Sequence, residues 1–200
     1  MMNALSSSAA LLVNALGGIY LLAILLRLLL QIAKADFYNP VSQAVVRITN
    51  PMVKIFRSVV PGYRGFDFSS LLLAIVVELI LIVALILLYG FPMPGAGTIV
   101  TWAVLGVVFF IINIYFWAII ASVIMSFVMM FSGMMSPHPV LRLIWQLTEP
   151  LMAPVRKVIP PMGGLDFSPM FIFIAIQLIR QLLSDSFGIT VNIASVIIGI

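Results

Sequence analysis

The chain has 200 residues, of which 64% are hydrophobic and only 8% are charged, and its net charge is +4. A soluble globular domain covers its surface with roughly 25% charged residues, so this composition excludes that class and indicates a protein whose solvent is lipid. The sequence has no cysteine and one histidine, His138. It therefore excludes disulfides, iron–sulfur clusters and thiolate metal sites, and we expect neither a metal site nor a cofactor.

Four apolar segments are long enough to cross a membrane, whose hydrocarbon core of about 30 Å requires about 20 helical residues. We expect spans at about 10–32, 70–91, 99–131 and 169–187. The third segment exceeds one perpendicular span and is interpreted as one tilted or extended helix. The fourth becomes polar near Arg180, and the apolar tail 188–200 is too short to cross a membrane alone.

No basic residue precedes the first apolar segment, whereas a cleaved secretory signal begins with a basic region. We therefore expect this segment to be a transmembrane helix of the mature protein.

The sequence contains an internal duplication. Shifted by 99 positions, residues 139–168 match residues 40–69 at 11 of 30 positions, whereas chance in so biased a composition would match about one position in ten. The duplication predicts two tandem repeats, 1–98 and 99–200, each with two spans. Because an even number of spans separates equivalent points, the repeats should be parallel, related by an axis along the membrane normal.

Basic residues are concentrated in the two long loops, which lie between spans one and two and between spans three and four. Eight of the ten lysines and arginines lie there, and the connection 92–98 contains none. By the positive-inside rule, both long loops should be cytoplasmic and both termini outside.

Each long loop is expected to contain amphipathic helices. Asn39-Pro40 and Asn50-Pro51 each pair a capping residue with a proline suited to the first helical position, so each should start a short helix. The second loop repeats this layout. The expected apolar stripes are Val41, Ala44, Val45, Ile48, Met52, Ile55, Phe56 and Val59 in the first loop, and Val140, Leu143, Ile144, Leu147, Leu151, Val155 and Val158 in the second.

Such helices suit the headgroup layer, with their basic faces toward lipid phosphates. Alternatively, the apolar stripes pack on the transmembrane helices. The candidate contacts for anionic lipid or for a protein partner are Lys54, Arg57, Arg142, Arg156 and Lys157.

The second loop ends in a long motif that runs from Thr148-Glu149-Pro150 through Arg156-Lys157 to Asp166-Phe167-Ser168-Pro169. This motif resembles the signature of the YggT family of bacterial and plastid membrane proteins, and the resemblance covers nearly the whole chain. The first copy departs from it, with Asn50 in place of Glu149 and Ser70 in place of Pro169.

The resemblance implies a place in the bacterial inner membrane. It also implies links with osmotic stress tolerance, ion uptake, cell division and the assembly of membrane complexes.

Asp67 and Asp166 stand just before the second span of each repeat, where a carboxylate can cap the helix N-terminus. Each also lies ten residues after an arginine, Arg57 or Arg156, which is an alternative partner. In the second copy Glu149 adds a further candidate carboxylate.

Glu78 and Arg180 lie deep within the second and fourth spans, where a lone charge costs at least about 2.5–3.5 kcal/mol. We expect them to form an ion pair between the repeats. The alternative is a polar conduit that also includes Asn113, Gln177 and Gln181.

Two further polar residues have simpler interpretations. Arg27 lies near the loop end of the first span and is expected to snorkel outward. His138 precedes Pro139 and is expected to cap a helix or to be solvated.

No catalytic pattern of the common hydrolase, phosphate-binding or zinc types is present, so we do not expect an enzyme. The first hypothesis is a non-catalytic membrane scaffold whose loop helices organise lipid or recruit a partner. The alternative is a subunit of an ion channel or transporter. The expected partners are anionic lipid headgroups and an unidentified membrane or cytoplasmic protein, with a homo-oligomer as an open alternative and no direct nucleic-acid contact.

Overall fold

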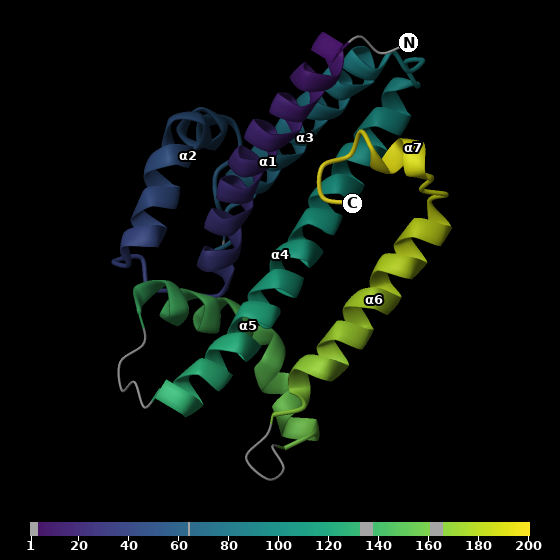
Figure 1. The fold of residues 1–200 in the computed structure, drawn as a ribbon. Helices are drawn as coiled ribbons and strands as arrows, with labels where there is room; N and C mark the ends of the chain where they lie inside the picture. The colour runs from purple at the N-terminus through teal and green to yellow at the C-terminus, as the bar shows by residue number, and fades with distance from the viewer. Residues whose placement is uncertain (1–3, 64, 133–137, 161–165) are drawn as a thin grey trace. The chain divides into compact units, whose positions relative to one another are not determined.

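The computed structural model describes residues 4–63, 65–132, 138–160 and 166–200, and the regular elements within them are helices (Figure 1). The long helices are α1 (Ala4–Ile32), α2 (Pro40–Val59), α3 (Phe68–Tyr89), α4 (Ala96–Ser132), α5 (Pro139–Val158) and α6 (Ser168–Ser186), and a short α7 covers Val191–Ala194.

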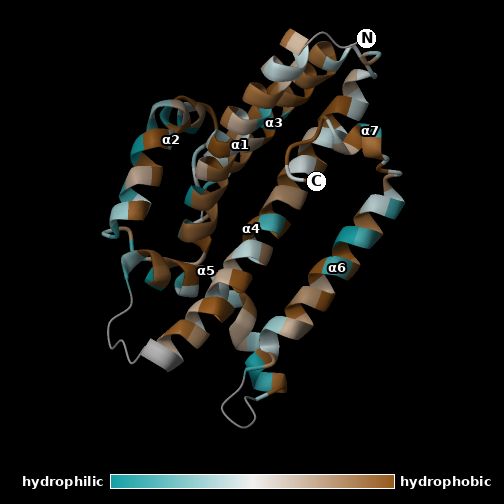
Figure 2. Ribbon diagram, viewed as in Figure 1, coloured by the Kyte–Doolittle hydropathy of each residue, from teal (hydrophilic) through white to brown (hydrophobic). Residues whose placement is uncertain are grey.

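Among the described residues, three helices are long and apolar enough to cross a membrane: α1, α3 and the part of α4 that ends at Met129. They correspond to the first three expected spans, and the chain is an all-helical, multi-pass membrane protein. Helix α6 matches the fourth expected span in position, but it has 19 residues and hydrophilic turns in its C-terminal half (Figure 2). Its crossing of the membrane stays a prediction.

The boundaries of α3 follow from local chemistry. Asp67 precedes the helix and accepts a hydrogen bond from the Ser70 N–H. Gly90 ends it in the left-handed conformation, with φ of 70°, and its N–H donates to the carbonyls of Ile86 and Leu87. Such a glycine satisfies carbonyls that the last turn would leave free.

The expectation of two short helices per loop is wrong. Helix α2 continues through Pro51, and α5 continues through Pro150 and Pro154. An internal proline removes one backbone hydrogen bond and costs about 3 kcal/mol. Residues packed on both sides of Pro51, such as Val45 and Val53, are buried and offset that cost.

The contacts divide the chain into two compact units. Unit 1 comprises Met1–Leu28, Val45–Ile111 and Ile189–Ile200, and unit 2 comprises Leu29–Ala44 and Ile112–Gly188. These units differ from the repeats 1–98 and 99–200, which are a division of the sequence and stay a prediction.

In unit 1, α1 and α3 approach closely at Gly17, where any side chain would meet Leu81. The C-terminal tail folds back into this unit, with Val196, Ile197 and Ile198 all buried. The tail is therefore a packed part of the protein, which its sequence did not indicate.

In unit 2, α4, α5 and α6 share an apolar cluster of Ile119, Met152, Ile172 and Ile176. A second cluster joins the end of α1 to α5 through Leu30, Ala35 and Leu143.

Candidate functional site

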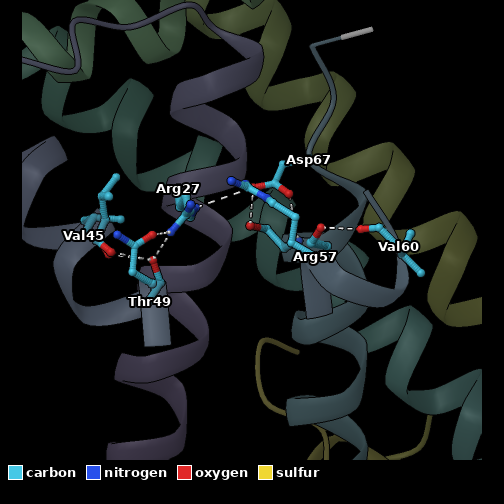
Figure 3. Close-up of polar contacts among 10 residues, drawn as sticks. Arg27, Val45, Thr49, Arg57, Val60 and Asp67 are labelled. Atoms are coloured by element: carbon cyan, nitrogen blue, oxygen red, sulfur yellow. Dashed lines mark hydrogen bonds and ion pairs between the residues drawn. The ribbon is translucent and has the colours of Figure 1, made fainter. Parts of the chain in front are cut away.

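The first polar cluster lies in unit 1, where α1, α2 and the start of α3 meet. Its centre is Asp67, whose side chain is 1% exposed. The Arg57 Nη2 donates to the Asp67 Oδ2 at 2.9 Å, and the Arg27 Nε lies 3.5 Å from the same oxygen (Figure 3). The arginine partner that the ten-residue spacing predicts is thus present, together with a second arginine.

Asp67 also caps α3. The Ser70 N–H donates to Oδ1 at 3.3 Å, and the Ser70 hydroxyl donates to Oδ2 at 2.8 Å. Burial alone would raise the pKa of Asp67, but the Ser70 hydrogen bonds and the charges of Arg57 and Arg27 outweigh it and lower this pKa below its ordinary value. The Asp67 carboxylate is therefore charged, and both of its oxygens accept hydrogen bonds.

The expectation that Arg27 snorkels outward is wrong, because this residue is buried. Its Nη1 donates to Thr49 Oγ1 at 3.0 Å and to Asn50 Oδ1 at 2.8 Å. Thr49 in turn donates to the Val45 carbonyl at 2.8 Å (Figure 3). Helix α2 supplies acceptors to the guanidinium, so the charge does not need to reach water.

The second polar cluster lies in unit 2, between α5 and the start of α6, and has one arginine. Arg156 Nε donates to Asp166 Oδ2 at 2.8 Å, and its Nη1 donates to the Glu149 oxygens at 2.8 and 3.0 Å. Asp166 accepts from the Ser168 N–H at 2.8 Å. Burial opposes both charges, but these bonds lower the pKa of Asp166 and raise that of Arg156.

The two clusters share a layout but differ in net charge. The duplication aligns Asn50 with Glu149 and Arg27 with Ser126. The first cluster thus holds two guanidinium groups and one carboxylate, and the second holds one guanidinium and two carboxylates. One carries a single positive charge and the other a single negative charge.

The candidate lipid contacts separate into two groups. Lys54, Arg142 and Lys157 are exposed and project from α2 and α5. Arg57 and Arg156 are held by the carboxylates of the clusters, which restrains their side chains. A role for any of the five in lipid or partner binding stays a prediction.

Much of the expected apolar stripe of α2 faces outward. Ile48, Ile55 and Val59 are 57%, 61% and 77% exposed, whereas Val45 of the same stripe is buried, as is Val53 outside it. In α5 the stripe is more enclosed, because Leu143 and Leu147 are buried. The stripe of α2 therefore has more exposed members than the stripe of α5.

The deep charges each have a polar partner. Arg180 Nη1 donates to Asn113 Oδ1 at 2.7 Å within unit 2. Glu78 is fully buried in unit 1, where its Oε1 accepts from the Ile198 N–H of the C-terminal tail at 2.9 Å. The ion pair that we expect between Glu78 and Arg180 stays a prediction, as does the polar conduit.

His138 caps α5, as expected, because its Nδ1 accepts from the Val140 N–H at 3.4 Å. Within the described residues, no group of three histidine, cysteine, aspartate or glutamate side chains is placed to hold a metal ion.

Sequence reasoning missed Arg27 and Thr49 as members of the first cluster. Thr49 carried a signal, because the duplication preserves it as Thr148, and both are buried and donate to the carbonyl four residues earlier. Arg27 carried none, because its aligned residue is Ser126.

Comparisons with known proteins agree with the duplication. The CCB3/YggT family model matches residues 6–88 and 101–187. An uncharacterized protein of Pseudomonas aeruginosa is 40% identical over 91% of both chains. The uncharacterized YggT of Escherichia coli K12 is 32% identical over 87% of this chain and 88% of its own.

An uncharacterized Vibrio alginolyticus protein from the proC 3' region is 32% identical over 91% of this chain and 96% of its own. No solved structure matches the chain. The match of the family model over both segments shows that the chain belongs to the CCB3/YggT family.

Proposed function

We propose that this protein is a non-catalytic scaffold of the bacterial inner membrane, in which α2 and α5 lie in the cytoplasmic headgroup layer. There they bind anionic lipid and recruit a protein partner. In this arrangement α6 is the fourth span, the two repeats are parallel, and both termini lie outside.

The observation that supports this proposal most is the outward apolar stripe of α2. Ile48, Ile55 and Val59 are well exposed, and burying such a side chain fully contributes about 1.5–3 kcal/mol. Exposed Lys54 lies on the same helix. An apolar stripe beside basic residues suits the boundary between acyl chains and phosphates, where each basic residue contributes about 1 kcal/mol.

The polar clusters suit a scaffold because they fix helix directions. The Arg57–Asp67 pair ties the last turn of α2 to the residue that caps α3, and the Arg156–Asp166 pair ties the last turn of α5 to the segment just before α6. A loop helix held in this way keeps one orientation relative to its span, which a docking surface requires.

A subunit of an ion channel or transporter is the second candidate. Glu78 favours it, because this buried carboxylate has one oxygen, Oε2, without a hydrogen-bond partner within the described residues. Ionisable groups inside transmembrane segments often belong to ion or proton pathways. The C-terminal tail packs against Glu78 and fills the space beside the carboxylate. This packing favours the scaffold over the channel.

The position of α2 can be measured directly, because the protein has no cysteine that would react with a label. Single cysteines at Ile48 and Ile55 would carry nitroxide labels in nanodiscs of phosphatidylethanolamine and phosphatidylglycerol. Labels on this stripe should relax faster with oxygen than with a water-soluble nickel chelate, and a label at Lys54 should show the reverse. Equal access of the chelate to all three sites would refute an interfacial α2.

Binding is tested by native mass spectrometry of the protein with its retained lipids and proteins. Exchange of Lys54 and Lys157 for glutamine should reduce the amounts of retained lipid and of retained partner protein. Lys34→Gln is the matched control, because Lys34 is exposed but lies outside α2 and α5. Retention of lipid and partners by the double variant would remove the basis of the scaffold. A deletion strain that carries either variant, followed for cell length and growth at high osmolarity, tests the biological links.

A further inference from the structure

Unit 2 contains a cavity of about 400 Å³ between the last turns of α4 and the first turns of α5. Its described lining consists of Ser122, Met125, Ser126 and Met129 from α4, and of Leu141, Arg142 and Trp145 from α5. This volume lies in the range of about 300–1,000 Å³ typical of small-molecule sites. It is smaller than a whole phospholipid but large enough for a headgroup and the adjoining part of its chains.

The lining combines an apolar wall with one cation. Met125, Met129 and Leu141 supply the wall. Arg142 is the charged member, and its Nη1 lies 4.0 Å from Asp36 Oδ2, with both side chains partly exposed. A pair at that distance and exposure is weak. Most of the five guanidinium N–H donors thus stay available to an anion.

In the proposed topology, the length of α4 brings the cavity to the level of the lipid headgroups. Helix α4 has 37 residues, so at about 1.5 Å per residue it is some 55 Å long and exceeds a hydrocarbon core of about 30 Å. If α4 is extended rather than tilted and the core begins at Ile99, about 20 residues bring α4 to the far side of the core near Ala118. Ser122 to Met129 lie beyond that level, and the exposed indole of Trp145 is typical of the membrane interface.

We propose that this cavity binds a single phospholipid with an anionic headgroup. Its phosphate accepts hydrogen bonds from Arg142, and its acyl chains leave along Met125 and Met129 into the bilayer. The proposal rests on the proposed position of α5 in the headgroup layer and adds a defined site to it. Arg142 is the only charged group in the described part of the lining. Its positive charge favours an anionic lipid over a zwitterionic one, whose ammonium group it would repel.

Trp145 is a built-in reporter of occupancy. A variant with Trp102→Phe and Trp117→Phe keeps Trp145 as its one tryptophan. It would be placed in phosphatidylethanolamine nanodiscs with brominated phosphatidylglycerol or brominated phosphatidylethanolamine as the minor lipid. Bromine quenches a tryptophan that it touches, so brominated phosphatidylglycerol should quench Trp145 at lower mole fractions. Equal quenching, or a preference for phosphatidylethanolamine, would overturn the proposal.

Two substitutions separate the site from general surface charge. Arg142→Gln should weaken binding of phosphatidylglycerol about tenfold, because it removes a charge-assisted hydrogen bond. Ser126→Phe should weaken it similarly by filling the cavity. Lys34→Gln removes an exposed charge that lies outside both loop helices and outside the lining, and it should have little effect. Size-exclusion chromatography and circular dichroism show whether each variant folds. If Ser126→Phe does not fold, the smaller substitution Ser126→Leu takes its place.

Each outcome has a defined meaning. Equal losses for Lys34→Gln and Arg142→Gln would overturn the defined site but leave interfacial lipid binding by the loop helices intact. Full binding by the filled variant would also overturn the site. Displacement of the lipid by soluble glycerol phosphate at equal concentration would show that the apolar wall contributes nothing, which contradicts the proposal. Failure of the nitroxide test on α2 concerns the scaffold and is independent of these outcomes.

Discussion

Asp67 and Asp166 occupy equivalent positions in the two repeats, yet their loss should have unequal effects. Asp67 is 1% exposed and faces two arginines, of which Arg27 is itself buried. Asp67→Asn keeps the size of the side chain and removes its charge, so two guanidinium groups lose their counter-charge. Removal of one partner from a buried ion pair costs about 3–5 kcal/mol.

Asp166 is 29% exposed, and its partner Arg156 keeps the two hydrogen bonds to Glu149 when Asp166 is neutralised. Asp166→Asn should therefore cost about 1 kcal/mol, as expected for a partly solvated pair. The difference between the two variants is then about 2 kcal/mol or more. It arises because the two clusters differ in burial and in the number of charges that remain.

The free energy of unfolding would be measured in mixed micelles by titration with sodium dodecyl sulfate, followed by circular dichroism. Asp185→Asn is the control, because this exposed carboxylate lies outside both clusters and should change stability by no more than about 0.5 kcal/mol. Equal losses for Asp67→Asn and Asp166→Asn would refute the argument from burial and remaining charge. A larger loss of unfolding free energy for Asp166→Asn than for Asp67→Asn would also contradict it.

Three further predictions follow from the same structure. The pKa values of Asp67 and Asp166 are lowered from an ordinary value of 3.8, so their contribution to stability is fully present above that value and is lost as the pH falls through the lower folded values. An unfolding midpoint that is constant from pH 5 to pH 2 would contradict this. Gly106→Val should displace the C-terminal tail, because a Cβ at this position would lie 2.5 Å from Glu78 Oε1 and 2.7 Å from the Ile197 Cγ2; proteolysis of the tail should accelerate, and an unchanged rate would show that the tail is not seated there. Reporters fused after Ile200 or within 92–98 should report outside, and reporters in the long loops should report inside; a cytoplasmic C-terminus would show that α6 does not cross the membrane.

The sequence was sufficient to locate the long helices, because an apolar run of spanning length has few alternatives to a helix in lipid. The spans expected at 10–32 and 70–91 became Ala4–Ile32 and Phe68–Tyr89. The sequence was insufficient to predict the bounds of the loop helices, since a proline such as Pro51 usually marks a helix start. Only packing of neighbouring residues on both sides decides whether the helix continues through it.

The candidate site was predictable only where the duplication marked it. The spacing of Arg57 and Asp67, preserved in the second copy, indicated their pairing. The burial of Arg27 depends on acceptors from α2, which no pattern in its own helix reveals. The tail was equally hidden, because its contact with Glu78 joins residues that are 120 positions apart and have no shared periodicity.

Divergence between the repeats links the second polar cluster to the cavity. Where the first repeat has Arg27, the second has Ser126, so α4 offers no guanidinium to the carboxylates there and Arg156 binds both of them. Ser126 is also part of the cavity wall, whereas an arginine at this position would extend a long side chain from the same helix. The absence of one arginine and the presence of Glu149 in place of Asn50 together account for the negative charge of the second cluster. The first of these differences also leaves a small side chain beside the proposed lipid. Ser126→Arg should accordingly reduce lipid binding even though it adds a positive charge, and an increase would show that charge matters more than space at this site.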